Sequence, residues 1–178
     1  NMTLSGESID FGPCAFMNIY KPDTFFSSID YNGRYSYQNQ PTITQWNVAR
    51  FAESIIPLIN KNKETSIKLA TEVINLFDKY FQKRWLEMMR SKLGLVKKHK
   101  DDKKLILELL KIMKEKNMDY TNTFRMLNQK KLYSKNLSFK NWFIDWQKRI
   151  NHFGSFESSQ KVMILKNPSV IPRNNLVE

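Results

Sequence analysis

The sequence predicts a mainly α-helical fold, and three observations support this prediction. From residue 41 onward, apolar side chains recur at spacings of three and four residues, which is the period of one face of a helix. Residues that favour helix ends, such as Ser138 and Gly94, stand at the borders of these periodic stretches. The first forty residues have no such period, and they hold three of the five glycines, Gly6, Gly12 and Gly33.

Three helices are predicted in the first part of the periodic region. One begins at Pro41–Thr42 and continues to Ile59, and a long one runs from about Glu64 to Leu93. Gly94 follows directly, where a helix C-cap is expected. A third helix covers Asp102–Lys116. The apolar positions predicted to face the core of the long helix are Ile67, Ala70, Val73, Ile74, Phe77, Tyr80, Phe81, Trp85 and Met88.

Three shorter helices are predicted after residue 118. The first follows Asp119 through Leu127, and the second begins at a Ser138 cap and reaches Ile150. The last covers Glu157–Leu165 and ends before Asn167-Pro168, because the residue before a proline disfavours the helical conformation. We interpret the aromatic stripes of these helices as core and not as a cofactor platform.

The chain is therefore expected to contain two parts. Residues 1–40 form a loop-rich segment, and residues 41–178 form a helical lobe. Long loop segments within a compact protein usually carry function. The first residues lack the pattern of a secretory signal, and position 1 is not methionine, so we expect the chain to be a piece of a longer protein.

Composition excludes several classes of site. There is no uncharged apolar run long enough to span a membrane. Cys14 is the only cysteine, and His99 and His152 are the only histidines, so no structural zinc site is expected. The formal charge of +12 could attract polyanions, but most lysines are scattered over predicted helix faces. The one dense stretch, residues 97–104, contains two aspartates and predicts a loop that enters a helix.

The tripeptide Asp10-Phe11-Gly12 is the most specific chemical signal in the chain. Protein kinases use this tripeptide to bind magnesium, because the phosphates of ATP need a hard divalent cation with oxygen ligands. A second ligand of this kind is often an asparagine amide upstream, and Asn1 precedes Asp10 by nine residues. The tripeptide alone is weak evidence for metal binding, because such a sequence also occurs in ordinary turns.

Three weaker candidates lie in or near the first forty residues. The hydroxyls of Thr24, Ser27 and Ser28 are open to modification, although exposed loop hydroxyls usually have no such role. Arg34 either positions a phosphate or ties the loop segment to the helical lobe, and we favour the second role. Cys14 is interpreted as a small buried hydrophobic residue in preference to a redox-sensitive thiol.

Longer strings of the sequence closely resemble the selenoprotein O family, in order and across almost the whole chain. The strings are Asn1-Met2, Ser8–Met17, Phe26–Asp30, Gly33–Pro41, Gln45–Ala52, Lys92–Leu95, Asp119–Thr121, Phe124-Arg125, Asn167-Pro168 and Arg173-Asn174.

The resemblance implies a protein-kinase-like fold, of which this chain would be the C-lobe with a loop-rich, metal-binding N-terminal segment. It implies a protein adenylyltransferase that moves AMP from ATP to Ser, Thr or Tyr hydroxyls, with Mg²⁺ or Mn²⁺ as cofactor. The family's metal ligands match Asn1 and Asp10, and Asp10 would also lie against the nucleotide phosphates. The family's general-base Asp would fall just before Asn1, and its glycine-rich and Lys/Arg phosphate-binding segments would also lie upstream. We therefore expect the chain alone to be inactive.

Two other functional classes stay open. One is a catalytically silent pseudokinase lobe that acts as a scaffold, and the other is a basic helical module that binds nucleic acid. A nucleic-acid-binding module needs exposed aromatic side chains among lysines that converge on one face. In this sequence the aromatic residues lie instead on the helix faces that are predicted to form the core. We expect the protein to bind ATP and protein substrates, and to bind neither nucleic acid nor membranes. We also expect it to be a monomer. The expected location is the cytoplasm in a bacterium and the mitochondrion in a eukaryote.

Overall fold

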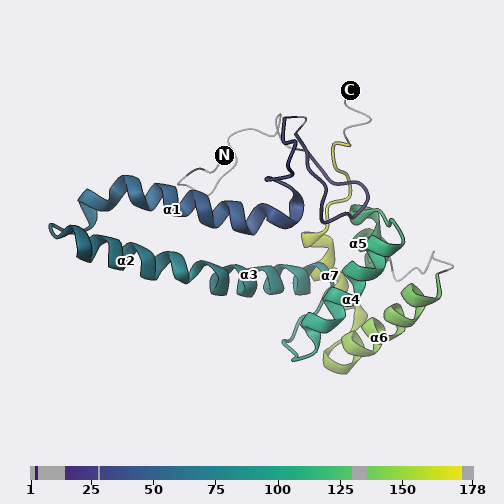
Figure 1. Ribbon diagram of the computed structural model, residues 1–178. Coiled ribbons are helices and arrows are strands. Elements are labelled where there is room, and N and C mark those ends of the chain that lie inside the picture. The colour runs from purple at the N-terminus through teal and green to yellow at the C-terminus, as the bar shows by residue number, and fades with distance from the viewer. Residues whose placement is uncertain (1–2, 4–14, 28, 130–135, 174–178) are drawn as a thin grey trace. The chain divides into compact units, whose positions relative to one another are not determined.

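The computed structural model describes residues 3, 15–27, 29–129 and 136–173. These residues contain seven α-helices and one short 3₁₀-helix, and they form no β-strand beyond an isolated bridge between Ile19 and Asp119 (Figure 1). The elements in chain order are η1 (Tyr37–Asn39), α1 (Gln40–Ile59), α2 (Lys63–Asn75), α3 (Phe77–Lys92), α4 (Asp102–Glu115), α5 (Tyr120–Asn128), α6 (Leu137–Phe153) and α7 (Phe156–Lys166). The predicted mainly α-helical class is confirmed. Within the described ranges, no helix combines the length and the apolar character needed to cross a membrane.

The helices belong to two compact units. Unit 1 contains Pro22–Arg84, and Ala15 also belongs to it. Unit 2 contains Phe16–Lys21 and the described part of Trp85–Glu178. Helix α3 begins in unit 1 and ends in unit 2. The predicted division into a loop-rich segment, residues 1–40, and a helical lobe, residues 41–178, stays a prediction.

Unit 1 is built on the antiparallel hairpin of α1 and α2 (Figure 1). Asn62 caps α2, and its side chain accepts a hydrogen bond from the Thr65 amide at 2.9 Å. Across the hairpin, the Gln45 side-chain amide donates to the Ile74 carbonyl at 3.3 Å. These contacts fix the turn and the alignment of the two helices.

The predicted long helix over Glu64–Leu93 is wrong in one respect, because it is two helices. The α-helical hydrogen-bond pattern is interrupted at Leu76. Its backbone amide donates to the carbonyl of Val73, three residues earlier in the chain. Such a bond is typical of a 3₁₀ turn, which winds the backbone more tightly than an α-helix. The α-helical bond pattern resumes directly afterwards, as the Tyr80 amide donates to the Leu76 carbonyl. The outer ends, Lys63 and Lys92, lie within one residue of the prediction.

The predicted core stripe of this long segment is also wrong in part. Ile67, Val73, Tyr80 and Met88 are exposed, with Val73 at 66%. The remaining positions of the stripe are half-buried. A pair of helices packs along one narrow line, and full burial of an apolar face needs a second layer of structure. Within the described part of unit 1, the only buried apolar side chain is Ile43, which is still 8% exposed.

Unit 2 has the fully buried core. Trp146 lies at its centre, with 0% exposure, and its indole nitrogen donates to the Leu93 carbonyl at 2.9 Å. The indole nitrogen of Trp142 donates to the Leu105 carbonyl at 2.8 Å. Both tryptophans therefore bury their rings without leaving a buried donor unpaired. The fully buried side chains around them include Phe124, Phe139, Met89, Leu93, Ile106, Leu109, Met113, Leu127 and Met163.

The helix ends in unit 2 follow the sequence with one exception. Asp119 caps α5 by accepting from the Asn122 amide at 2.7 Å. Gly94 has a φ of +68° and ends the α3 segment, and a Cβ there would approach Ser159 to 2.9 Å. The predicted Ser138 cap is wrong, because Asn136 caps α6 by accepting from the Phe139 amide at 3.1 Å. Asparagine is as good an N-cap as serine, and this one starts the helix earlier, at Leu137.

A buried charge cluster joins three helices of unit 2. Asp102, at the start of α4, is 1% exposed. One carboxylate oxygen accepts from Arg90 Nε at 2.6 Å and from the His99 amide at 2.9 Å. The other accepts from Arg149 Nε at 2.8 Å. Residues 97–101 thus form the predicted loop before the helix, and this loop is held by the same carboxylate.

The segment Phe16–Lys21 completes unit 2 from the other end of the sequence. The Tyr20 amide donates to the Met118 carbonyl at 2.9 Å, and the Tyr120 amide donates to the Asn18 carbonyl at 2.7 Å. Arg173 donates to the side chains of both Asn18 and Asp119, at 2.8 and 2.7 Å. The start of α5 is therefore held by two segments that are distant in sequence.

Candidate functional site

The predicted metal ligands, Asn1 and Asp10, lie outside the described residues, as do Cys14 and Ser28. Their roles therefore stay predictions. Among the residues that are described, no group of three or more His, Cys, Asp or Glu side chains is placed to hold a metal ion. The candidate site that the structure describes is the segment that follows them, residues 22–47.

This segment is folded against the start of α1 by backbone hydrogen bonds. The Gln38 amide donates to the Pro22 carbonyl, and the Tyr37 amide donates to the Thr24 carbonyl, both at 2.8 Å. The side chain of Gln40 donates to the Tyr35 carbonyl at 2.6 Å. The loop therefore has a defined shape although it contains no helix or strand before Tyr37 in its described part.

Asp30 organises the turn at the centre of the segment. Its two carboxylate oxygens accept from the backbone amides of Arg34 and Tyr35, each at 2.8 Å. Gly33 completes the turn with a φ of +61°, a left-handed conformation that favours glycine. Asp30 is 8% exposed, and its charge is stabilised by these two amides. The sequence analysis did not single out Asp30, although an aspartate three residues before a glycine is a common turn signal.

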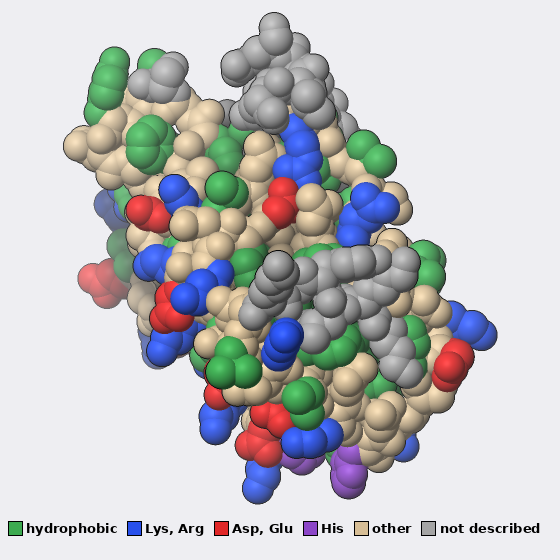
Figure 2. All heavy atoms as spheres, turned by 90° about the vertical axis from the view of Figure 1, so that its right-hand side faces the viewer, with side chains coloured by type: hydrophobic (Ala, Val, Ile, Leu, Met, Phe, Trp, Pro, Cys, Tyr) green, Lys and Arg blue, Asp and Glu red, His purple; other side chains and the backbone are tan. Residues whose placement is uncertain are grey.

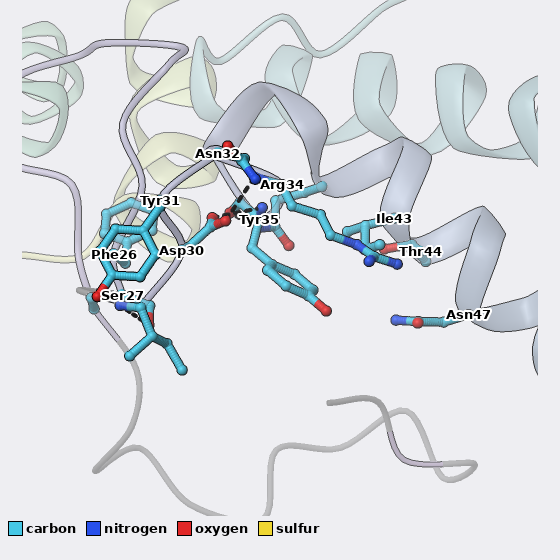
Figure 3. A pocket seen from close by; sticks show the side chains of 13 residues that line it. Phe26, Ser27, Asp30, Tyr31, Asn32, Arg34, Tyr35, Ile43, Thr44 and Asn47 are labelled. Atoms are coloured by element: carbon cyan, nitrogen blue, oxygen red, sulfur yellow. Dashed lines mark hydrogen bonds between the residues drawn. The ribbon is translucent and has the colours of Figure 1, made fainter.

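A hollow of about 830 Å³ lies between this turn and α1 (Figure 3). Its lining comes from the loop and from the first turns of the helix. The lining residues are Ala15, Phe26, Ser27, Ile29, Asp30, Tyr31, Asn32, Arg34, Tyr35, Gln40, Ile43, Thr44 and Asn47. Several of its apolar members are exposed, including Phe26 at 39% and Ile29 at 80%.

Of the described lining residues, Arg34 alone carries a positive charge. Its guanidinium carbon lies 4.7 Å from the Trp46 ring centre and 5.7 Å from that of Tyr35. Such contacts fix the direction of an arginine without satisfying its charge through an acid. Trp46 belongs to α1, so this stacking is the contact expected if Arg34 ties the loop to the helix. A role in positioning a phosphate stays a prediction.

The candidate hydroxyls lie at different places in the segment. Thr24 is half-buried and its carbonyl accepts from the Tyr37 amide, whereas Ser27 is exposed and lines the hollow. The Ser27 hydroxyl accepts from the Ile29 amide at 3.4 Å. Modification of either hydroxyl stays a prediction.

A second group of motif residues gathers in unit 2. Lys92 Nζ lies 4.5 Å from the ring centre of Phe124 and 5.4 Å from that of Tyr120. Asn167 donates to the Lys92 carbonyl at 2.8 Å. The strings that begin at Lys92, Asp119 and Asn167 therefore meet in the fold, and their contacts hold helices together. Burial lowers the pKa of Lys92 to about 8.

Replacing Lys92 with methionine is expected to raise the stability of the protein at neutral pH. The folded-state pKa of about 8 lies below the ordinary value of 10.5, so the unfolded state binds more protons between these values. The free energy of unfolding should therefore rise with pH between about 8 and 10.5, by at most about 1.4 kcal/mol per pH unit from this group. Methionine keeps the contact with the rings and removes the titration.

The measurement is denaturant unfolding of both proteins at pH 7 and pH 9.5. The stability advantage of the methionine variant should shrink at the higher pH. Lys148→Met is the control, because Lys148 is an exposed partner of Asp145. An advantage that is equal at both pH values would contradict the lowered pKa.

Basic side chains elsewhere in unit 2 are mixed with acidic ones. On the face drawn in Figure 2, Lys and Arg side chains alternate with Asp, Glu and apolar groups. A shallow hollow of about 500 Å³ on α4 is lined by Lys100, Lys103, Lys104, Leu107, Glu108 and Lys111. Lys104 and Lys111 are paired with Glu108 and Glu115, each at 3.9 Å. This surface has the mixed charge of an ordinary solvated helix.

Comparison with known proteins adds a family to this geometry. A profile of the family described as "Protein adenylyltransferase SelO" matches residues 1–178. A protein of Pelagibacter ubique is 52% identical over 183 aligned residues, and a protein of Clostridium botulinum strain Eklund 17B is 49% identical over the same length. A protein of Nitrosococcus oceani is also 49% identical. All three are named protein nucleotidyltransferase YdiU.

These alignments include 100% of this chain but only 37 or 38% of each relative. The chain therefore spans less than two fifths of the length of the curated relatives that it matches.

Proposed function

Because this chain belongs to the SelO family, we propose that it is part of a protein adenylyltransferase, which transfers AMP from ATP to Ser, Thr or Tyr hydroxyls of other proteins. The observation that carries the proposal is the match of residues 1–178 to the family described by that activity. The nucleotidyltransferase names of the relatives support the same chemistry. The proposal includes a protein-kinase-like fold, with the described helices as part of its C-lobe.

The proposed reaction has a simple balance. The acceptor hydroxyl oxygen forms a bond to the α-phosphorus of ATP, and the bond from that phosphorus to the pyrophosphate oxygen breaks. The hydroxyl proton passes to a base, which we propose is an aspartate preceding Asn1 in the full-length protein. The resulting products are an AMP ester of the target protein and pyrophosphate.

Asn1 and Asp10 would hold Mg²⁺ or Mn²⁺ in this proposal. An amide oxygen and a carboxylate are hard oxygen ligands, so the donor set fits such an ion. When bound, the ion offsets negative charge on the phosphates of ATP. Asp10 would in addition fix the nucleotide phosphates relative to the acceptor.

The test uses the full-length protein with magnesium, a protein acceptor, and ATP labelled at either the α- or the γ-phosphate. Label from the α-phosphate is expected to enter the acceptor, and label from the γ-phosphate is not. Incorporation of the γ-label would indicate kinase activity instead. Failure of both labels to enter any acceptor would favour a catalytically silent lobe.

A further inference from the structure

The hollow between the loop and α1, which is lined mainly by residues in the range 26–47, has the features of a binding site for a negatively charged peptide. Arg34 is the one cation among the described residues that line it. No acidic side chain in the described part of the chain forms an ion pair or hydrogen bond with the Arg34 guanidinium, which instead contacts the rings of Tyr35 and Trp46. The arginine is thus held in direction by stacking while its N–H groups stay available to an incoming acceptor.

The neighbouring Asp30 does not neutralise this arginine. Both Asp30 oxygens accept hydrogen bonds from backbone amides, those of Arg34 and Tyr35. In Figure 3, the Arg34 side chain runs away from Asp30 and along α1, past Thr44 and toward Asn47. In the same figure the Tyr35 side chain also points away from Asp30, and its hydroxyl lies on the side where the Arg34 and Asn47 side chains end. A carboxylate placed there would meet a guanidinium and a phenol together.

The charge of the lining favours a singly charged group over a nucleotide. Among the described residues that line the hollow, the charged side chains are one acid, Asp30, and one base, Arg34. ATP carries several negative charges and needs several cations to bind it. One carboxylate with an apolar residue in the same peptide matches a lining that holds one arginine together with Phe26, Ile29 and Tyr31, which are 39, 80 and 88% exposed.

We propose that this hollow docks an extended segment of the target protein, with an acidic side chain of that segment on Arg34 and an apolar one against Phe26 and Ile29. The proposal deepens the proposed function, because it states which acceptors the enzyme prefers: hydroxyl residues with Asp or Glu and an apolar residue nearby. The claim that the docked segment accepts AMP rests on the proposed function, whereas the binding of the segment to the hollow is a separate property.

The experiment uses the full-length protein and fluorescein-labelled peptides of about ten residues that contain one serine. Glu or its neutral isostere Gln is placed at each position in turn, beside an apolar residue. Two quantities are measured for each peptide, namely its dissociation constant by fluorescence anisotropy and its rate of AMP transfer. At the best position, the Glu peptide is expected to bind about tenfold more tightly than the Gln peptide, as for one charge-assisted contact.

Arg34→Gln is expected to remove this difference and to leave the KM for ATP unchanged. Arg34→Glu, with a Lys peptide at the same position, is expected to restore a preference with the opposite charge. Arg50→Gln is the matched control. Arg50 also lies over the Trp46 ring, at 5.3 Å, but it is paired with Glu53 and does not line the hollow. This control should keep the Glu preference.

Several outcomes would overturn the docking proposal. Arg34→Gln could weaken the binding of the Glu and Gln peptides equally, and Arg34→Glu could show no preference for the Lys peptide. These two results together would assign Arg34 a purely structural role. A raised KM for ATP would make the hollow a nucleotide site. If the Glu peptide binds at no position, the hollow is not a docking site for an acidic segment. A Glu preference in binding that depends on Arg34, without AMP transfer to any peptide, would uphold the docking site and contradict the proposed function instead.

Discussion

Replacing Asp10 with alanine in the full-length protein is expected to slow AMP transfer by about a thousandfold. In the proposed function this carboxylate holds the divalent ion against the phosphates. A loss of roughly 4 kcal/mol of transition-state stabilisation corresponds to that factor. Asn1→Ala is expected to cost less, because a neutral amide contributes less charge than a carboxylate. Rates are measured with ATP labelled at the α-phosphate.

The melting temperature of the same Asp10 variant separates chemistry from folding. It should stay the same or rise, because a metal-site carboxylate without its ion is not a packing residue. Activity close to wild type would remove Asp10 from the mechanism. A large fall in melting temperature would assign it a structural role.

Replacing Asp102 with asparagine is expected to lower the free energy of unfolding by about 3–5 kcal/mol, the usual cost of removing one partner from a buried ion pair. The side chains of Arg90 and Arg149 are only 9 and 10% exposed, and both would lose their acid. Asp145→Asn is the control, since Asp145 and Lys148 form an exposed pair worth less than about 1 kcal/mol. Denaturant unfolding followed by tryptophan fluorescence measures both variants. Equal effects at the two sites would contradict the importance of the cluster.

The Asp102 cluster should also make stability depend on pH. Burial alone would raise the pKa of Asp102, but hydrogen bonds from Arg149, Arg90 and the His99 amide outweigh it and hold the pKa below its ordinary value of 3.8. The unfolded state therefore takes up a proton first as the pH falls. The contribution of Asp102 is fully present above the ordinary value and is lost as the pH falls through the lowered folded-state pKa. The asparagine variant should lack this part of the acid sensitivity.

Helix positions could be predicted from the sequence because their signals are local. Asp119 and Gly94 mark ends through backbone preferences that need no partner. The interruption at Leu76 could not be predicted, because it consists of one hydrogen bond to the third residue back inside a continuous apolar period. Exposure was predicted less well than helicity, as Val73 and Tyr80 show, since burial depends on which element lies opposite.

The candidate site shows the same division between local and distant information. Arg34 could be singled out from its sequence, but its contact with Trp46 could not, because Trp46 lies on a helix twelve residues later. Asp30 shapes the hollow through two backbone amides, and such a role is recognised from coordinates more readily than from residue type. The metal-binding assignment of Asn1 and Asp10 stays a prediction from the sequence.

The arrangement of unit 2 has a consequence for synthesis on the ribosome. Asn18 is paired through its side chain with Arg173, which is 155 residues further along the chain. All of Pro22–Arg84 is made between the first segment of unit 2 and the rest of it. The segment Phe16–Lys21 must therefore wait, without its partners, until residues 118–120 have emerged, and it is locked only when residue 173 follows. Folding of this unit is thus completed only after nearly the whole of this stretch has left the exit tunnel.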